Sequence, residues 1–157
     1  MEERRMKHAY EDFEVGSAVQ LSAHTFTREE IVSFAERYDP QPFHLTEAVG
    51  EATHFGGLAA SGWNTCSAMI SILVRDMVGD STSMGSPGLD NIRWIKPVRV
   101  GDTVRLTVHV LNKRVSKSKP DPGIVQTRWK AHNQKGEIVL TVDSAALFGL
   151  RNSGAAV

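Results

Sequence analysis

The sequence contains one cysteine, Cys66, among 157 residues. A disulfide within the chain is therefore impossible, and a reducing compartment is compatible with this composition. The sequence also lacks a set of cysteines and histidines with the spacing of a zinc site. We therefore expect a fold held together by its hydrophobic core, without covalent or metal cross-links.

An excess of charge of either sign is also missing, since 18 lysines and arginines balance 18 acidic residues. Proteins that bind nucleic acid through its phosphate backbone usually show a basic excess. The balance argues against a nucleic acid partner. It also leaves no net charge to keep two copies of the chain apart.

Long hydrophobic runs are absent as well. None approaches the roughly 20 residues of a helix that crosses a bilayer, and the charged residues 1–8 are not followed by the apolar run of a secretory signal. We predict a soluble, cytoplasmic protein that does not enter a membrane. A length of 157 residues with 41% hydrophobic side chains suits a single domain over residues 1–157, with loose tails at about 1–6 and 152–157.

Two segments have the pattern of helices. Residues 27–30, Thr-Arg-Glu-Glu, have the form of a capping box, and apolar residues then recur at helical spacing until Asp39-Pro40 ends the helix. The second helix begins near Ser61. It carries no charge over residues 62–73, which predicts a helix that is buried nearly all round.

The remaining segments have the pattern of strands. Apolar and polar residues alternate loosely over residues 18–26 and clearly over 103–110 and 125–131, and 86–96 and 137–150 complete the set. A short turn at 133–136 joins the last two strands of the chain as a hairpin. A sheet that wraps an apolar helix predicts the α+β fold class.

The aperiodic segment between the two helices contains Asp39 and His44, a carboxylate and an imidazole five residues apart on a chain stiffened by Pro40 and Pro42. Acid–base catalysis needs such groups within reach of the proton they move, and a rigid segment can set that reach. On spacing alone, a structural role is the simpler interpretation, with Asp39 capping the helix and His44 partly buried in a loop.

A run of small residues, 57–62, precedes the second helix. Small side chains at the start of a buried helix let a ligand approach the free backbone amides, which favour an oxygen that gains negative charge. For this run alone, an ordinary Ser61 cap with close packing is again the simpler interpretation.

Together, the two features resemble the MaoC-like dehydratases and (R)-specific enoyl-CoA hydratases. The family pattern is D-x-N-P-x-H, followed by a small-residue stretch that ends in glycine at the start of the central helix. Here Asp39-x-Gln41-Pro42-x-His44 is followed, eighteen residues after the histidine, by Gly62. The turn at residues 97–102 is also similar, and the resemblance covers roughly residues 27–148.

The resemblance implies a hot-dog fold, in which an antiparallel sheet wraps a long central helix, paired as a homodimer or a higher even oligomer. It implies an acyl thioester of coenzyme A as substrate. Asp39 and His44 would hold a water molecule and shuttle protons between its oxygen and the α-carbon, while the Gly62 amide polarises the thioester carbonyl. No metal or redox cofactor is required, and coenzyme A enters as part of the substrate.

Two positions depart from the family pattern. Gln41 stands where asparagine is usual, and Ser61 stands where many hydratases have histidine before the glycine. Neither change removes a proposed catalytic group, but both leave the substrate open. Trp63, just inside the helix, is expected to be a core aromatic, with a narrowing of the acyl tunnel as the alternative.

Other reactive or charged residues receive no catalytic role. His54 is expected to be structural, and Cys66 a small core residue. Arg114, Lys117 and Lys119 have the charge to meet coenzyme A phosphates, but a solvated turn explains them better.

Two other functions fit the same fold. The first is another hot-dog enzyme, a thioesterase or a dehydratase of the fatty-acid-synthesis type, which commonly places a carboxylate on the central helix. Residues 62–75 contain neither Asp nor Glu, which favours a hydratase whose acid lies in the loop. The second alternative is a non-catalytic module that binds acyl thioesters. The presence of both Asp39 and His44 argues against it.

Overall fold

The computed structural model describes residues 8–115, 117–119 and 121–151. Five strands form one antiparallel sheet in the order β1-β3-β4-β5-β2. Their bounds are Ala18–Thr25 for β1, Gly88–Trp94 for β2, Thr103–Arg114 for β3, Gly123–His132 for β4 and Ile138–Phe148 for β5. The predicted tails, 1–6 and 152–157, lie outside the described residues.

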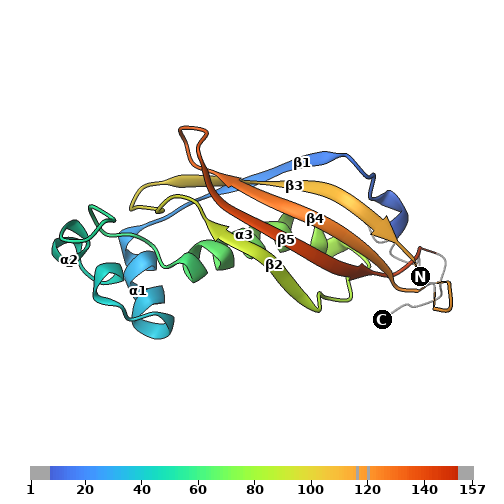
Figure 1. Ribbon diagram of the computed structural model, residues 1–157, viewed down its shortest axis with the longest axis horizontal. Coiled ribbons are helices and arrows are strands. Elements are labelled where there is room, and N and C mark those ends of the chain that lie inside the picture. Colours follow the sequence, from blue (N-terminus) through green and yellow to red (C-terminus); the bar gives the residue numbers. More distant parts are fainter. Residues whose placement is uncertain (1–7, 116, 120, 152–157) are drawn as a thin grey trace, which may run out of the picture.

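The sheet curves around the long helix α3 (Gly62–Asp76), while α1 (Arg28–Tyr38) and the short α2 (Glu47–Glu51) lie together beyond one end of the sheet (Figure 1). The predicted α+β class, with an antiparallel sheet wrapped around one long helix, is confirmed. Across the described stretches, no helix has the length and hydropathy of a membrane-spanning segment.

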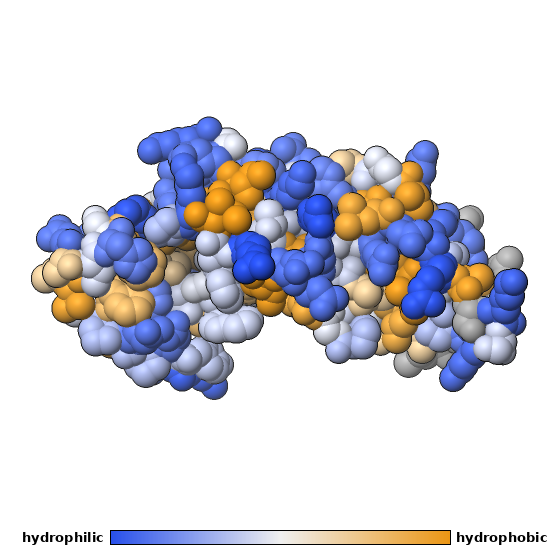
Figure 2. Space-filling view, in the orientation of Figure 1, coloured by the Kyte–Doolittle hydropathy of each residue, from blue (hydrophilic) through white to orange (hydrophobic). Residues whose placement is uncertain are grey.

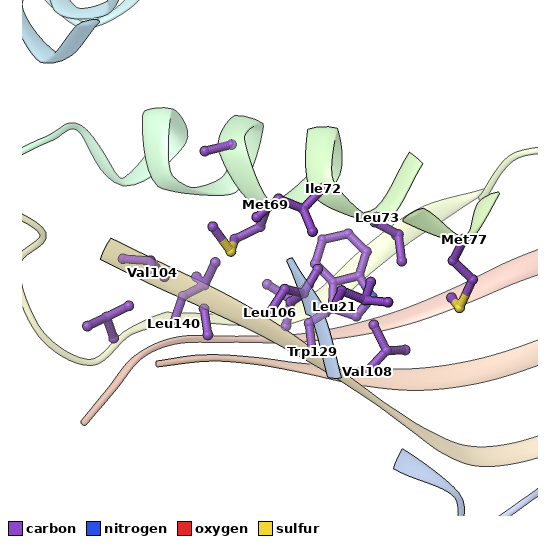
Figure 3. Close-up of a cluster of buried hydrophobic side chains, with 14 of the residues drawn as sticks. Leu21, Met69, Ile72, Leu73, Met77, Val104, Leu106, Val108, Trp129 and Leu140 are labelled. Atoms are coloured by element: carbon purple, nitrogen blue, oxygen red, sulfur yellow. The ribbon is translucent and has the colours of Figure 1, made fainter. Parts of the chain in front are cut away.

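The core lies between α3 and the concave face of the sheet. Met69, Ile72 and Leu73 of α3 face Leu106 of β3 and Trp129 of β4 (Figure 3). All five side chains are buried. Burying one such side chain contributes roughly 1.5–3 kcal/mol, so this layer is the main reason that the sheet closes around the helix.

The lack of charge in α3 predicted a helix that is buried nearly all round, and this prediction is wrong. Trp63, Ile70 and Val74 are 54%, 42% and 44% exposed. They recur along one side of the helix, because residues four or seven apart share a face. The sheet of a single chain covers only the opposite side, and an apolar stripe remains on the surface.

The first helix begins as predicted, with Thr27 as its cap. The Thr27 hydroxyl accepts a hydrogen bond from the Glu30 amide at 3.2 Å. The prediction of a full capping box is wrong, because the Glu30 carboxylate does not bond back to the Thr27 amide. It bonds instead with the His24 ring at 2.7 Å and the Asn64 side-chain amide at 3.1 Å. Glu30 thereby ties α1 to β1 and α3.

The segment at 40–60 is more regular than its sequence indicated. It contains a single turn of 3₁₀-helix at Pro42–His44 and the helix α2, which Thr46 caps. Elements this short do not span enough residues to show a period. They fold the segment back over the start of α3, which places its side chains beside that helix.

The turn at 97–102 has the shape that leads into a strand. Gly101 has φ of +86°, a region that costs a residue with a Cβ atom. Its amide donates to the Phe26 carbonyl at 2.8 Å, and Asp102 accepts from the Arg99 amide at 2.9 Å. The turn is therefore fixed to the beginning of α1.

Candidate active site

Three local structures bring the predicted residues to one place. Asp39 is the residue that ends α1, and its amide donates to the Ala35 carbonyl at 2.9 Å. His44 is the last residue of the 3₁₀ turn that starts at Pro42. Gly62 is the first residue of α3, directly after its cap, Ser61. All three catalytic candidates line one pocket.

His44 is held in a defined orientation. Its side chain is 6% exposed, and Nδ1 lies 2.7 Å from the Ala59 carbonyl oxygen. A carbonyl oxygen can only accept, so Nδ1 carries the hydrogen. In the neutral ring Nε2 is then the basic nitrogen, and it lies 3.4 Å from Oδ2 of Asp39. The backbone of residue 59 thus selects the tautomer whose free nitrogen faces the carboxylate.

Asp39 receives a hydrogen bond on each carboxylate oxygen. The Ser61 hydroxyl donates to Oδ2 at 2.7 Å, and the Gln41 side-chain amide donates to Oδ1 at 2.7 Å. Burial alone would raise the pKa of Asp39, but the bonds from Ser61 and Gln41, together with the nearby His44, lower that pKa below its ordinary value. Asp39 is therefore a carboxylate at neutral pH.

The departures from the family pattern, Gln41 and Ser61, are thus the residues that hold Asp39. Their contribution was not visible in the sequence. The Ser61 hydroxyl also accepts from the Trp63 amide at 3.3 Å, so one side chain caps α3 and orients the acid. A serine or threonine that precedes a helix is a usual cap, but its second partner depends on how α1 and α3 pack.

Gly62 presents a backbone amide at the start of α3. The first helical hydrogen bond runs from the Thr65 amide to the Ser61 carbonyl at 3.1 Å, so the helix itself supplies no acceptor for the Gly62 amide. The Cα of Gly62 lies against the Trp94 indole. A Cβ atom at this position would come within 2.4 Å of Cε2 of Trp94. Close packing against Trp94 therefore favours glycine at this position.

The pocket around these groups has a volume of about 470 Å³. Its polar lining comes from the Gly62 backbone and from six side chains: Asp39, Gln41, His44, His54, Thr65 and Lys96. Most of the remaining wall is aromatic or aliphatic and includes Phe43, Phe55, Trp63, Trp94, Val98 and Val139. Apolar walls with a few convergent polar groups are typical of small-molecule sites. Among the described residues that line it, Asp39 is the one carboxylate.

The structure corrects the expectation for Trp63 and places two other residues, His54 and Cys66, more closely. Trp63 is not a core aromatic, because it is 54% exposed and lines the pocket. His54 also lines it, with its ring 4.1 Å from that of Phe55. Cys66 is half-buried, and burial raises the pKa of its thiol, an effect partly offset by a hydrogen bond from Trp94. The sequence analysis did not identify Trp94 as a pocket residue. Its position at the end of a predicted strand was the only feature that could have indicated this role.

The basic residues considered for phosphate binding lie elsewhere. Arg114, Lys117 and Lys119 belong to the end of β3 and the turn after it, and none of the three lines this pocket. Within the described part of the chain, no group of three or more His, Cys, Asp or Glu is arranged to hold a metal ion.

Comparison with known proteins bears on the family and the fold. The model of the MaoC like domain matches residues 12–132. The MaoC-like dehydratase from Rhodospirillum rubrum is 33% identical, with 90% of this chain and 97% of that chain covered and a TM-score of 0.81. The (R)-hydratase from A. caviae, described as involved in PHA biosynthesis, is 25% identical, with 86% and 96% covered and a TM-score of 0.67.

A third structure bears on the fold alone. The Mycobacterium tuberculosis protein Rv0216 is 16% identical, with a TM-score of 0.79, and is described as a double hot-dog fold. The alignment covers 95% of this chain but 46% of that chain. The fold of this chain therefore matches about half of Rv0216, which carries two such units.

Proposed function

The chain belongs to the family of MaoC-like dehydratases, with the hot-dog fold, and we propose that it adds water to, or removes water from, an enoyl or 3-hydroxyacyl thioester of coenzyme A. The observation that carries this proposal is the position of the His44 ring between the Ala59 carbonyl and the Asp39 carboxylate. Its Nδ1–H is bonded to the Ala59 carbonyl, which leaves Nε2 as a base 3.4 Å from the Asp39 carboxylate.

In the proposed hydration, one water molecule binds beside Asp39 and His44, within hydrogen-bond reach of both side chains. Nε2 of His44 takes a proton from this water as its oxygen bonds to the β-carbon of the enoyl group. The imidazolium then returns a proton to the α-carbon, so the sum is one water added and no net proton change. Asp39 remains a carboxylate, orients the water and stabilises the imidazolium. Dehydration follows the same steps in reverse.

The thioester carbonyl gains negative charge while the α-carbon is a developing enolate. We propose that the Gly62 amide donates to this oxygen, because it lacks a helical acceptor and lies at the positive end of α3. The reaction as proposed uses proton transfer and one backbone donor. It needs neither metal nor redox cofactor, and coenzyme A is part of the substrate.

We also propose that the working unit is a homodimer, or a multiple of one. In β2, which forms one edge of the sheet, six of seven residues are exposed. Two apolar side chains on and beside it, Leu89 and Ile95, are 40% and 53% exposed. Figure 2 shows hydrophobic patches among hydrophilic side chains on the face that it draws. A second copy at this edge would cover apolar surface and pair free backbone groups.

The proposed activity is tested with a panel of enoyl-CoA and 3-hydroxyacyl-CoA thioesters. Loss or gain of enoyl absorbance without release of free coenzyme A thiol supports hydration or dehydration. Release of thiol would identify a thioesterase instead. Tight binding of the thioesters with neither change would identify a binding module.

The reducing cytoplasm, which one cysteine permits, is the proposed location.

A further inference from the structure

Two tryptophans form one wall of the pocket. Trp63 comes from the first turn of α3 and Trp94 from the end of β2, and their ring centroids lie 5.3 Å apart with an interplanar angle of 78°. Both line the pocket and are about half exposed. An edge-to-face pair of this kind gains stability beyond its buried area, so each ring holds the other in place.

Trp94 lies directly against the residue that we assign to the thioester oxygen. A Cβ atom on Gly62 would lie 2.4 Å from Cε2 and 2.5 Å from Nε1 of Trp94. These distances are possible only because glycine has no side chain. An acyl group whose carbonyl binds the Gly62 amide therefore begins beside the indole ring.

The backbone of Trp94 leaves the ring little freedom to move as a whole. Trp94 pairs with Leu140 in the ladder between β2 and β5, and the next amide, of Ile95, donates to the Val139 carbonyl at 2.8 Å. Pro97 follows two residues later. The indole is thus carried by a fixed strand end, and only a side-chain rotation would clear the space that it fills.

The rest of the pocket offers limited room. Phe43 and Phe55 stand in ring contact at 5.2 Å, and Val98 and Val139 are buried in the core. A volume of about 470 Å³ lies in the lower half of the usual range of about 300–1,000 Å³ for small-molecule sites. This space must hold the thioester group and the reacting water as well as the acyl chain.

Building on the proposed function, we propose that Trp94, braced by Trp63, limits the acyl group to a short chain. The substrates would then be short-chain enoyl or 3-hydroxyacyl thioesters. The physical cause is steric: beyond a few carbons, the chain meets an indole ring that Gly62 and Trp63 hold in place.

The size limit is measured by calorimetry with saturated acyl-CoAs, which a hydratase binds without turnover: butyryl, hexanoyl, octanoyl and decanoyl. Each further methylene that is buried normally tightens binding about fourfold. For the unmodified protein we expect this gain to stop before octanoyl. In Trp94→Ala the gain should continue through octanoyl, with binding at least about tenfold tighter than to hexanoyl.

Two further variants keep the experiment decisive. Trp94→Leu retains apolar bulk, so it should fold even if the alanine variant does not, and it should show a partial extension of the size limit. Leu111→Ala removes an equally exposed apolar side chain (44%) from β3, outside the pocket. This control should keep the native chain-length profile. Melting temperatures are recorded for all variants.

The outcomes separate this inference from the proposed reaction. Affinity that keeps rising to decanoyl in the unmodified protein, or a limit unchanged in both Trp94 variants, overturns the role of Trp94, whether or not enoyl-CoAs are hydrated. A Trp94-dependent limit without hydration of any enoyl-CoA supports that role and overturns the hydratase assignment. Failure of all four thioesters to bind overturns the size limit set by Trp94, whereas the hydratase assignment is decided by the enoyl-CoA assay.

Discussion

The hydroxyl of Ser61 donates to Oδ2 of Asp39 at 2.7 Å, so the residue that starts the central helix also fixes the carboxylate of the site. Asp39 ends α1 and Ser61 precedes α3. The position of the Asp39 carboxylate therefore depends on how α1 packs against α3. A small shift of one helix against the other would change the distance between Asp39 and His44.

Removal of either acid–base group should abolish most turnover. We expect Asp39→Asn and His44→Ala each to lower kcat about 10²–10⁴-fold on the best thioester found, because each group orients or deprotonates the same water. The kcat of the double variant should be only slightly below that of the less active single variant, since the effects of residues that act as a unit do not add. Circular dichroism checks the fold, and near-native kcat in either folded variant would remove that residue from the mechanism.

Ser61→Ala should move the acid limb of the pH–rate profile to higher pH. The hydrogen bond from Ser61 favours the carboxylate form, so its loss raises the pKa of Asp39. Protonation of Asp39, and with it loss of rate, then begins at a higher pH than in the native protein. The lost helix cap should also cost about 1 kcal/mol of unfolding free energy.

Thr27→Ala provides the matched control for this shift. Thr27 caps α1, at the end of the helix opposite Asp39, and its hydroxyl accepts from the Glu30 amide. The variant should lose a similar free energy of unfolding without changing the acid limb. Equal shifts in both variants would mean that stability, and not the bond to Asp39, governs the pH profile.

The role of the Gly62 amide has to be tested where Trp94 does not interfere. Any Cβ atom at position 62 meets the indole, so Gly62→Ala and Gly62→Pro in the native background both report crowding. In a Trp94→Ala background the two variants differ mainly in the amide hydrogen. Proline fits the first turn of a helix, but it has no N–H to donate.

We expect Gly62→Pro/Trp94→Ala to turn over about 10²–10³-fold more slowly than Gly62→Ala/Trp94→Ala, the usual cost of one oxyanion donor. Rates are compared on a short enoyl-CoA, with melting temperatures to show that both proteins fold. Equal rates in the two double variants would place the donor to the thioester oxygen elsewhere.

Light scattering at micromolar concentration should give the mass of a dimer or of a multiple of it. A charge at the proposed contact should weaken assembly, so Leu89→Lys on β2 should shift the mass towards the monomer. Val19→Lys on β1, the opposite edge of the sheet, serves as control, since Val19 is similarly exposed (43%). A monomeric native protein, or dissociation by Val19→Lys alone, would contradict the proposed arrangement.

The sequence by itself determined the elements of this fold. Alternation placed the strands, helical spacing and the lack of charge placed α3, and Thr27 and Ser61 marked the helix starts. These signals are local, since they depend on neighbours within one or two turns or along one strand. Asp39, His44 and Gly62 were chosen as candidates from the sequence by their resemblance to a family motif, and all three line one pocket.

Only the tertiary structure decided how those residues are held. The bond from Ser61 joins positions 22 residues apart, and the bond from His44 to Ala59 joins positions 15 apart. Trp94 reaches Gly62, on α3, from the end of β2. One side of α3 stays exposed because one sheet covers only the other side. Such contacts depend on how the helices and strands pack, and no periodic pattern in the chain encodes them.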